Sequence, residues 1–146
     1  MRCKAPAGHW STTTMISALC LGGAIAGAVV KGPIDGDVFI AWVRDALVPG
    51  LRPGQIVVMD NLPAHKRPAV REMIEAAECE LWMLPPYSPD LNPIEMMWSK
   101  VKQLIRGCEP RTFETLTQAV FDAMDAVTSQ DANGFFAHCG YQRPLV

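Results

Sequence analysis

Two carboxylates stand where the local sequence restricts the backbone. Asp60 ends the apolar stretch "QIVVMD", and Glu95 follows the proline-rich "PPYSPDLNP" near the start of an amphipathic segment. Metal ions that promote phosphoryl transfer lie about 3.5–4 Å apart and tolerate little displacement of their ligands, so a metal site needs such fixed carboxylates. Asp60 and Glu95 are therefore candidate ligands of one metal site.

Each acid also has a structural interpretation. Asp60 can cap the turn that follows it, because Asp and Asn side chains bond to nearby backbone amides. Glu95 can complete a capping box in which Asn92 is the N-cap and Pro93 occupies the first helical position. Taken singly, each acid is better explained as a cap, and it is their combination that favours a metal site.

The segment that carries Glu95 has two distinct faces. A helix over about 93–106 would bury the stripe Ile94, Met97, Trp98, Val101 and Ile105. Along the flank of that stripe runs a second row, made of Glu95, Ser99, Lys102 and Arg106. A row that begins with an acid and ends with two cations suits a metal at the acid and a phosphate backbone along the bases. The alternative is a solvated flank whose cations complement the helix dipole.

Prolines dominate the approach to this helix. Proline fixes φ and restricts the residue before it, so "PPYSPDLNP" has few unfolded conformations to lose. We expect this stiff segment to deliver Glu95 to a set position.

The remaining elements follow from periodicity and turn residues. Strands are predicted at about 12–21, 24–31, 55–59 and 80–84. Helices are predicted at about 36–48 after a cap at Asp35, at 66–78, and at 113–128 after a cap at Thr112, with a short helical turn near 130–136. This order indicates an α/β layer with helices on both faces of a sheet, in which polar groups at strand ends gather into a site.

Composition restricts the function less than the motifs do. A net charge of −2 and a pI of about 5.9 give no global attraction to nucleic acid, so any DNA contact must be local. The apolar run over residues 15–30 could be a signal peptide, but it is short for a membrane span and is split by Gly22 and Gly23. A β-hairpin that turns at the two glycines explains it better, and no membrane association is expected.

Three stretches resemble a known family. "VVMDNLPAHK", "LPPYSPDLNPIEMMWSKVK" and "FFAHCGY" closely resemble the DDE transposases of bacterial insertion sequences related to the mariner superfamily. The 34 residues between Asp60 and Glu95, residues 61–94, match the interval associated with that branch. The resemblance covers essentially the whole chain, including "GHWSTTT" and "LVPGLRPG".

The resemblance implies a ribonuclease H-like fold, with a mixed sheet in the order 3-2-1-4-5 between layers of helices. It implies a triad of two Asp and one Glu that binds Mg²⁺ or Mn²⁺, with Asp60 as the second acid and Glu95 as the third. The implied reaction cuts DNA at transposon ends and joins them to target DNA, generally by a homodimer in the bacterial cytoplasm, at the nucleoid when bound to DNA. His65 and Lys66 match the "HK" of the family, and they are assigned either to DNA or to the surroundings of the metal ligands.

The chain departs from the family pattern at its beginning. The first triad Asp has no counterpart here and is expected upstream of Met1, since Asp35 and Asp37 lie where the family has a helix start. Residues 1–146 are therefore predicted to be a partial catalytic domain without the helix-turn-helix region and without the central first strand.

That strand would lie between the strands at about 12–21 and 55–59 and leave both edges unpaired, unless residues 1–10 or a separately encoded N-terminal half fill the gap. We expect the chain alone to be marginally stable and inactive. The alternatives are a non-catalytic remnant that binds DNA or a transposase, and another ribonuclease H-like nuclease.

Overall fold

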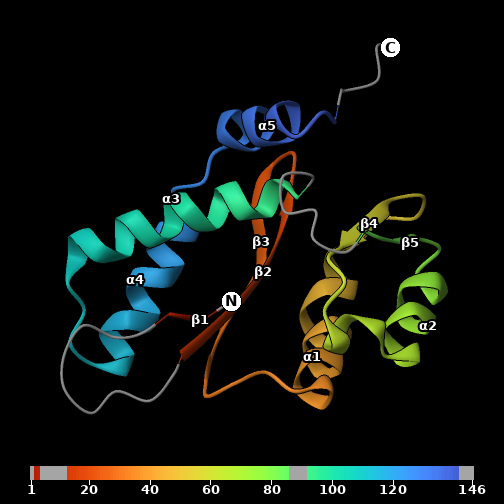
Figure 1. Cartoon of the computed structure of the whole chain (residues 1–146), viewed down its shortest axis with the longest axis horizontal. Helices are drawn as coiled ribbons and strands as arrows, with labels where there is room; N and C mark the ends of the chain where they lie inside the picture. Colours follow the sequence, from red (N-terminus) through yellow and green to blue (C-terminus); the bar gives the residue numbers. More distant parts are fainter. Residues whose placement is uncertain (1, 4–12, 86–91, 142–146) are drawn as a thin grey trace. The chain divides into compact units, whose positions relative to one another are not determined.

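The computed structural model describes residues 2–3, 13–85 and 92–141, which belong to two compact units (Figure 1). The first unit comprises Met1–Pro33 together with Pro93–Val146, and the second comprises Ile34–Asn92. The chain thus leaves the first unit, forms the second, and returns to the first at the residue that begins the Glu95 helix.

The first unit contains an antiparallel sheet in the order β1-β2-β3, with β1 (Arg2–Cys3), β2 (Thr13–Cys20) and β3 (Gly23–Lys31). Strands β2 and β3 form the predicted hairpin, which turns at Leu21 and Gly22 and has an irregular register between Ile16 and Ala18. The apolar run is therefore part of a sheet. No helix in the described ranges is long and apolar enough to cross a membrane.

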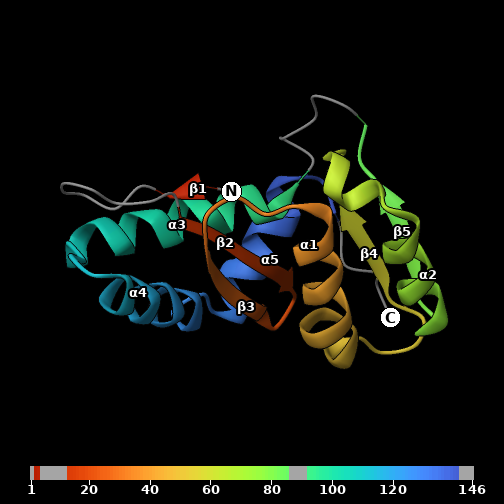
Figure 2. The ribbon, with the colours of Figure 1, turned by 90° about the horizontal axis from the view of Figure 1, so that it is seen from below.

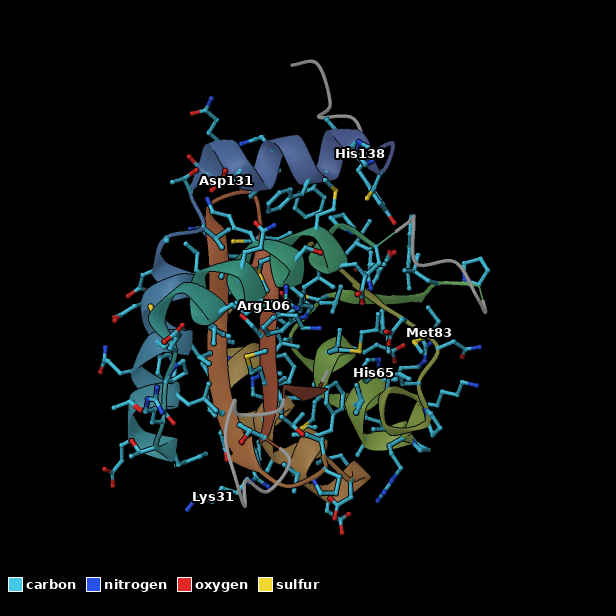
Figure 3. The ribbon with its side chains drawn as sticks, turned by 60° about the vertical axis from the view of Figure 1, so that its left-hand side comes forward. Lys31, His65, Met83, Arg106, Asp131 and His138 are labelled. Carbon is cyan, nitrogen blue, oxygen red and sulfur yellow. The ribbon has the colours of Figure 1, made fainter. Side chains whose placement is uncertain are left out.

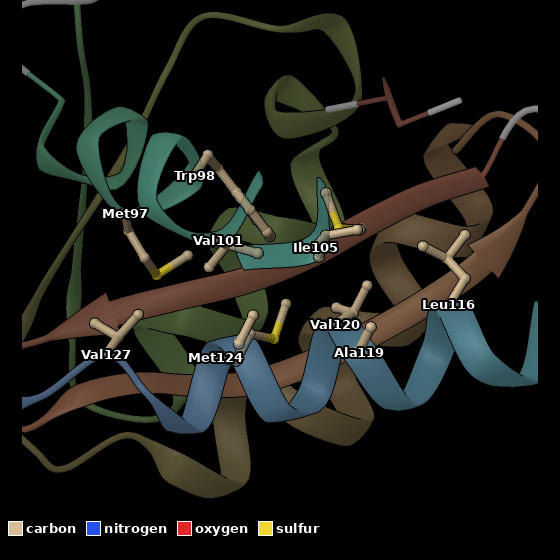
Figure 4. Close-up of a cluster of buried hydrophobic side chains, with 11 residues drawn as sticks. Met97, Trp98, Val101, Ile105, Leu116, Ala119, Val120, Met124 and Val127 are labelled. Atoms are coloured by element: carbon tan, nitrogen blue, oxygen red, sulfur yellow. The ribbon is translucent and has the colours of Figure 1, made fainter. Parts of the chain in front are cut away.

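Helices α3 (Pro93–Cys108) and α4 (Phe113–Asp125) pack together with the β2–β3 hairpin around one apolar core. Figure 4 shows the α3 side chains lying against those of α4 beside the two strands. The predicted α3 stripe is confirmed, with Ile94 partly buried at its edge. The core contains Met15, Met97, Trp98, Val101, Ile105, Leu116, Ala119, Val120, Ala123, Met124 and Val127.

Two capping boxes mark where the last two helices begin. Thr112 caps α4 as predicted, with Thr115 as its reciprocal partner, and Thr128 caps α5 (Ser129–His138) with Asp131. Figure 3 shows Asp131 near the beginning of α5 and His138 at its other end. The short helical turn predicted near 130–136 is therefore a helix of ten residues, because the capping box satisfies the first amides of the helix.

The second unit combines a parallel strand pair with two helices. It contains β4 (Ile56–Met59), α2 (Pro68–Ala76) and β5 (Glu80–Met83), preceded by α1 (Gly36–Trp42), the π turn η1 (Val43–Leu47) and the 3-10 turn η2 (Val48–Gly50). Strand β4 pairs in parallel with β5, and α2 connects them (Figure 2). Asp35 caps α1 as predicted, because its Oδ1 accepts a 2.9 Å hydrogen bond from the Val38 amide.

Two predicted helices differ from the observed ones at prolines. The helix predicted over 36–48 widens into η1 and then tightens into η2, because Pro49 has no amide hydrogen and its ring conflicts with the carbonyl four residues earlier. The helix predicted over 66–78 begins only at Pro68, after the 3-10 turn η3 (Pro63–Lys66). Arg67, which precedes that proline, is extended at φ −62° and ψ 131°.

The strands form two separate sheets in the described part of the chain. Strand β1 lies within residues 1–10, one candidate for filling the gap, and it pairs with β2 at Thr13 and Thr14. It was not predicted as a strand, because two residues are too short to show an alternating pattern. Strand β4 has β5 as its partner. Within the described ranges, no strand pairs with both β2 and β4.

Gly23 provides a test of the hairpin. Its φ is +125°, and a Cβ there would lie 2.7 Å from the main-chain oxygen of Val127, so Gly23→Ala should lower the free energy of unfolding by about 1–3 kcal/mol. The neighbouring Gly22→Ala is the control, because the nearest atom to its added Cβ is Cys20 Sγ at 3.8 Å. Urea unfolding followed by circular dichroism would measure both variants. Equal midpoints for the two would contradict this account of the turn.

Candidate metal and phosphate site

Asp60 lies at the carboxyl end of the parallel strand pair. The pairing of β4 with β5 continues to the residue before it, because the Leu84 amide donates a 2.8 Å hydrogen bond to the Met59 carbonyl. This bond fixes the backbone from which the Asp60 side chain projects. The side chain is 38% exposed, so part of the carboxylate is accessible to solvent and ligands.

The carboxylate of Asp60 faces the imidazole of His65 within the same unit (His65 is labelled in Figure 3). The His65 Nδ1 lies 2.7 Å from Asp60 Oδ1 and 3.0 Å from the Asp60 main-chain oxygen. One N–H cannot align with both acceptors, and its direction favours the main-chain oxygen. Oδ1 is thus buried next to the imidazole without a well-directed hydrogen-bond donor.

The surroundings of Asp60 favour its ionised form. The His65 ring, whose Nδ1 lies 2.7 Å from Oδ1, is the largest influence and lowers the pKa of the Asp60 carboxyl below its ordinary value, although its N–H is better directed at the main-chain oxygen. Burial acts in the opposite direction, whereas the charge of the ring and the Leu62 amide lower the pKa further. Asp60 is therefore a carboxylate kept charged in a partly desolvated position, as a ligand for a hard cation must be.

Glu95 lies in the first turn of α3, in the first unit, and its side chain is half-buried. The helix begins at Pro93 as predicted, and Pro93 and Asn92 are both buried. The stiffening expected from the proline-rich approach falls largely on residues 86–91, which lie outside the described residues.

The residues of the predicted row Glu95, Ser99, Lys102 and Arg106 all lie on α3. Ser99 is exposed and its hydroxyl donates to the Glu95 carbonyl at 3.2 Å, while Lys102 is half-buried and Arg106 exposed. Neither Lys102 nor Arg106 forms an ion pair with any described residue. Lys100, on the same helix, differs from them, because its ammonium group donates to Asp131 and to the Ala126 carbonyl.

The other acids near the start of the chain are engaged elsewhere. Asp35 caps α1, and Asp37 pairs with Arg67 at 3.1 Å. Lys66, by contrast, is exposed and has no ion-pair partner among the described residues. Within the described ranges, no three His, Cys, Asp or Glu side chains gather where they could hold one ion.

Sequence reasoning did not identify the role of Phe39. Its ring in α1 lies against the His65 ring, with centroids 4.5 Å apart and planes inclined by 34°. No local pattern connects these residues, because α1 and η3 come together only in the folded unit. The five-residue spacing between Asp60 and His65 around Pro63 was the one signal that could have suggested their contact.

This α/β chain has an ionised aspartate at the end of a parallel strand and a glutamate at the start of a helix. That combination is typical of metal-dependent enzymes that act on nucleic acids, so the chain is compared with that class. Residues 2–117 match the family described as DDE superfamily endonuclease, and the chain belongs to that family. Both Asp60 and Glu95 fall within the matched residues.

One curated relative is the transposable element Tcb2 transposase of Caenorhabditis briggsae, which is 40% identical over 48 residues. The match covers 33% of this chain and 18% of that relative, so the chain corresponds to a minor part of its length.

Two solved structures of the Mos1 transposase catalytic domain with Raltegravir have the same fold. The structure with Mg has a TM-score of 0.71 at 19% identity and covers 88% of this chain and 70% of that one. The structure with Mn also has a TM-score of 0.71, at 15% identity, and covers 94% of this chain and 75% of that one. The predicted ribonuclease H-like fold is thus confirmed, as the fold of a mariner-type catalytic domain.

The lowered pKa of Asp60 gives a pH-dependent prediction. A carboxyl whose pKa is lower in the folded state stabilises the fold above its unfolded pKa of about 3.9, and this stabilisation disappears as the pH falls through the folded value. The loss of unfolding free energy in Asp60→Asn should therefore be larger at pH 6 than at pH 3, by urea unfolding. Asp125→Asn is the control, because Asp125 is exposed and has no hydrogen-bond or ion-pair partner among the described residues. A loss independent of pH would contradict the prediction.

Proposed function

We propose that this chain supplies most of the catalytic domain of a DDE transposase, which cuts the ends of a transposable element and joins them to target DNA. Asp60 and Glu95 act as the second and third acids of a triad that binds Mg²⁺ or Mn²⁺. The observation that carries the proposal is Asp60, a carboxylate kept ionised at the end of a parallel strand in a chain of this family. The resemblance of its motifs supports the further proposal that the element is a bacterial insertion sequence and that the protein acts at the nucleoid.

The residues present fit a divalent ion. Carboxylate oxygens are the donors that Mg²⁺ prefers, and the Asp60 side chain is 38% exposed, so part of its carboxylate is open to an ion while Oδ1 lies buried beside His65. When bound, the ions supply an activated oxygen nucleophile and neutralise charge on the phosphate. Asp60 and Glu95 would hold the ions, and the surroundings of Asp60 keep its carboxyl ionised.

The unpaired cations supply the contact to DNA. Lys102 and Arg106 are not neutralised by any described acid, so they can replace counterions on a phosphate backbone without first breaking an ion pair. Ser99 can add a hydrogen bond to phosphate beside them, and Lys66 offers a cation close to Asp60 in sequence. A local patch of this kind explains how a chain with a net charge of −2 can bind DNA.

Asp35 and Asp37 do not supply the third carboxylate in this proposal, because they are engaged with α1 and with Arg67. We infer that this carboxylate lies on a strand of a separately encoded N-terminal half or an upstream segment, which would pair with β4 and with the part of β2 beyond Thr13 and Thr14, where β1 is already bound. Such a strand would satisfy backbone groups at both edges and join the two sheets. The complete enzyme would act as a homodimer that holds two DNA ends.

Since no three acidic or other ligand side chains gather within the described residues, a second candidate function is that residues 1–146 bind DNA without cutting it. Binding depends on Lys102 and Arg106, whereas cutting depends on a complete metal site. A ribonuclease H-like nuclease of another family would differ from both in cutting DNA that carries no transposon end.

Metal binding tests the two acids directly. Asp60→Asn and Glu95→Gln should each weaken Mn²⁺ binding by about tenfold or more, because each removes a direct ligand and even partners of ligands contribute 10–100-fold. Glu114→Gln is the matched control, since Glu114 is an exposed acid in the first turn of α4. Electron paramagnetic resonance of free Mn²⁺ would give the affinities. Unchanged affinity in both variants, or an equal loss in Glu114→Gln, would refute the assignment.

The salt dependence of DNA binding tests the cation row. Lys102→Ala and Arg106→Ala should each weaken binding to duplex DNA and reduce the slope of log K against log salt by about 0.9, the contribution of one phosphate contact. Arg44→Ala removes the same charge from a residue already paired with Asp45, and it should leave the slope unchanged. Fluorescence anisotropy at several salt concentrations would measure the slopes. Equal slopes in all variants would show that α3 does not contact phosphate.

A further inference from the structure

We propose that His65 is the positioning residue of Asp60. Its Nδ1–H donates to the Asp60 main-chain oxygen and lies beside Oδ1, so that the outer carboxylate oxygen is presented to the metal. This inference rests on the proposed function, in which Asp60 is a metal ligand. It assigns to His65 a role at the carboxylate instead of a contact with DNA.

The turn after β4 brings the two residues together. Pro63 begins η3, and the His65 amide donates a 3.0 Å hydrogen bond to the Leu62 carbonyl, which closes the turn. This places the His65 ring back against the residue five positions earlier, with Nδ1 within 3.0 Å of two oxygens of Asp60. The side chain of His65 is only 18% exposed, so the ring is held in the unit and not extended into solvent.

The His65 ring is also held by a contact with a second aromatic ring. Phe39 is 5% exposed and lies 4.5 Å from the His65 ring, and it contacts Trp42 at 5.5 Å between centroids. An imidazole that lies against a buried aromatic ring cannot turn freely about its last torsion. The core of the second unit therefore sets the direction of Nδ1, and Nδ1 in turn restrains Asp60.

This geometry determines the tautomer of the neutral ring. Both atoms that face Nδ1 are oxygens of Asp60, and both are acceptors, so Nδ1 must carry the proton and Nε2 must be bare. The orientation of the carboxylate follows, because Oδ1 lies buried 2.7 Å from the ring nitrogen and the exposed part of the side chain is left for the ion. Partners of this kind, which orient a ligand without touching the metal, typically contribute 10–100-fold to metal affinity.

Two amide substitutions separate this role from simple packing. The side-chain N–H₂ of asparagine reaches about as far as Nδ1 of histidine, whereas that of glutamine reaches about as far as Nε2. His65→Asn should therefore bind Mn²⁺ within about threefold of the unsubstituted chain, and His65→Gln should bind about tenfold more weakly. Both variants lose the contact of the ring with Phe39, so a packing role would weaken both equally.

The tautomer gives a second measurement that needs no metal. In long-range ¹H–¹⁵N spectra of the unsubstituted chain at a pH where the ring is neutral, the His65 Nδ1 should show the shift of a protonated nitrogen and Nε2 that of a bare one. The signals are assigned by their loss in His65→Asn. A proton on Nε2, or a loss of Mn²⁺ affinity in His65→Asn as large as in His65→Gln, would overturn the proposal. If Asp60→Asn leaves Mn²⁺ binding unchanged, the proposed function fails instead.

Discussion

The central constraint in this chain is the partial burial of a charged carboxylate at the end of a strand. Removing an ionised oxygen from water is costly unless it is paired or hydrogen-bonded, and burial alone would raise the pKa of Asp60. The parallel pairing of β4 with β5 fixes the backbone, and His65 and the Leu62 amide keep the carboxylate charged. The turn η3, the Phe39 contact and the position of α1 all serve this arrangement within the second unit.

Much of the fold could be predicted because its signals are local. The β2–β3 hairpin, the α3 stripe and the caps at Asp35 and Thr112 each follow from a few adjacent residues. The exceptions arise where a proline competes with a periodic pattern, as at Pro49, or where pairing depends on distant residues, as in β1. Apolar periodicity shows which face of a segment is buried, but it does not show where a backbone donor is missing.

The residues of the candidate site differ in how far the sequence predicts their positions and contacts. The positions of Asp60 after a strand and of Glu95 in the first turn of a helix could be predicted, because the sequence itself marks the ends of those elements. The contact of His65 with Phe39 could not, since it depends on how α1 packs against η3. The sequence also could not show that Lys102 and Arg106 have no ion-pair partner among the described residues, because Lys100 carries the same charge on the same helix and is paired.

The two acids belong to different compact units, and this connects the metal site to the continuity of the sheet. Within the described residues β2 and β4 lie in separate sheets, so no shared hydrogen-bond register relates Asp60 to Glu95. A strand that paired with both would impose such a register, because neighbouring strands lie about 4.8 Å apart and fix each other's alignment. In the proposed enzyme, the strand that carries the third carboxylate would therefore also complete the sheet. Metal affinity and the stability of the fold should consequently rise together when that strand is present.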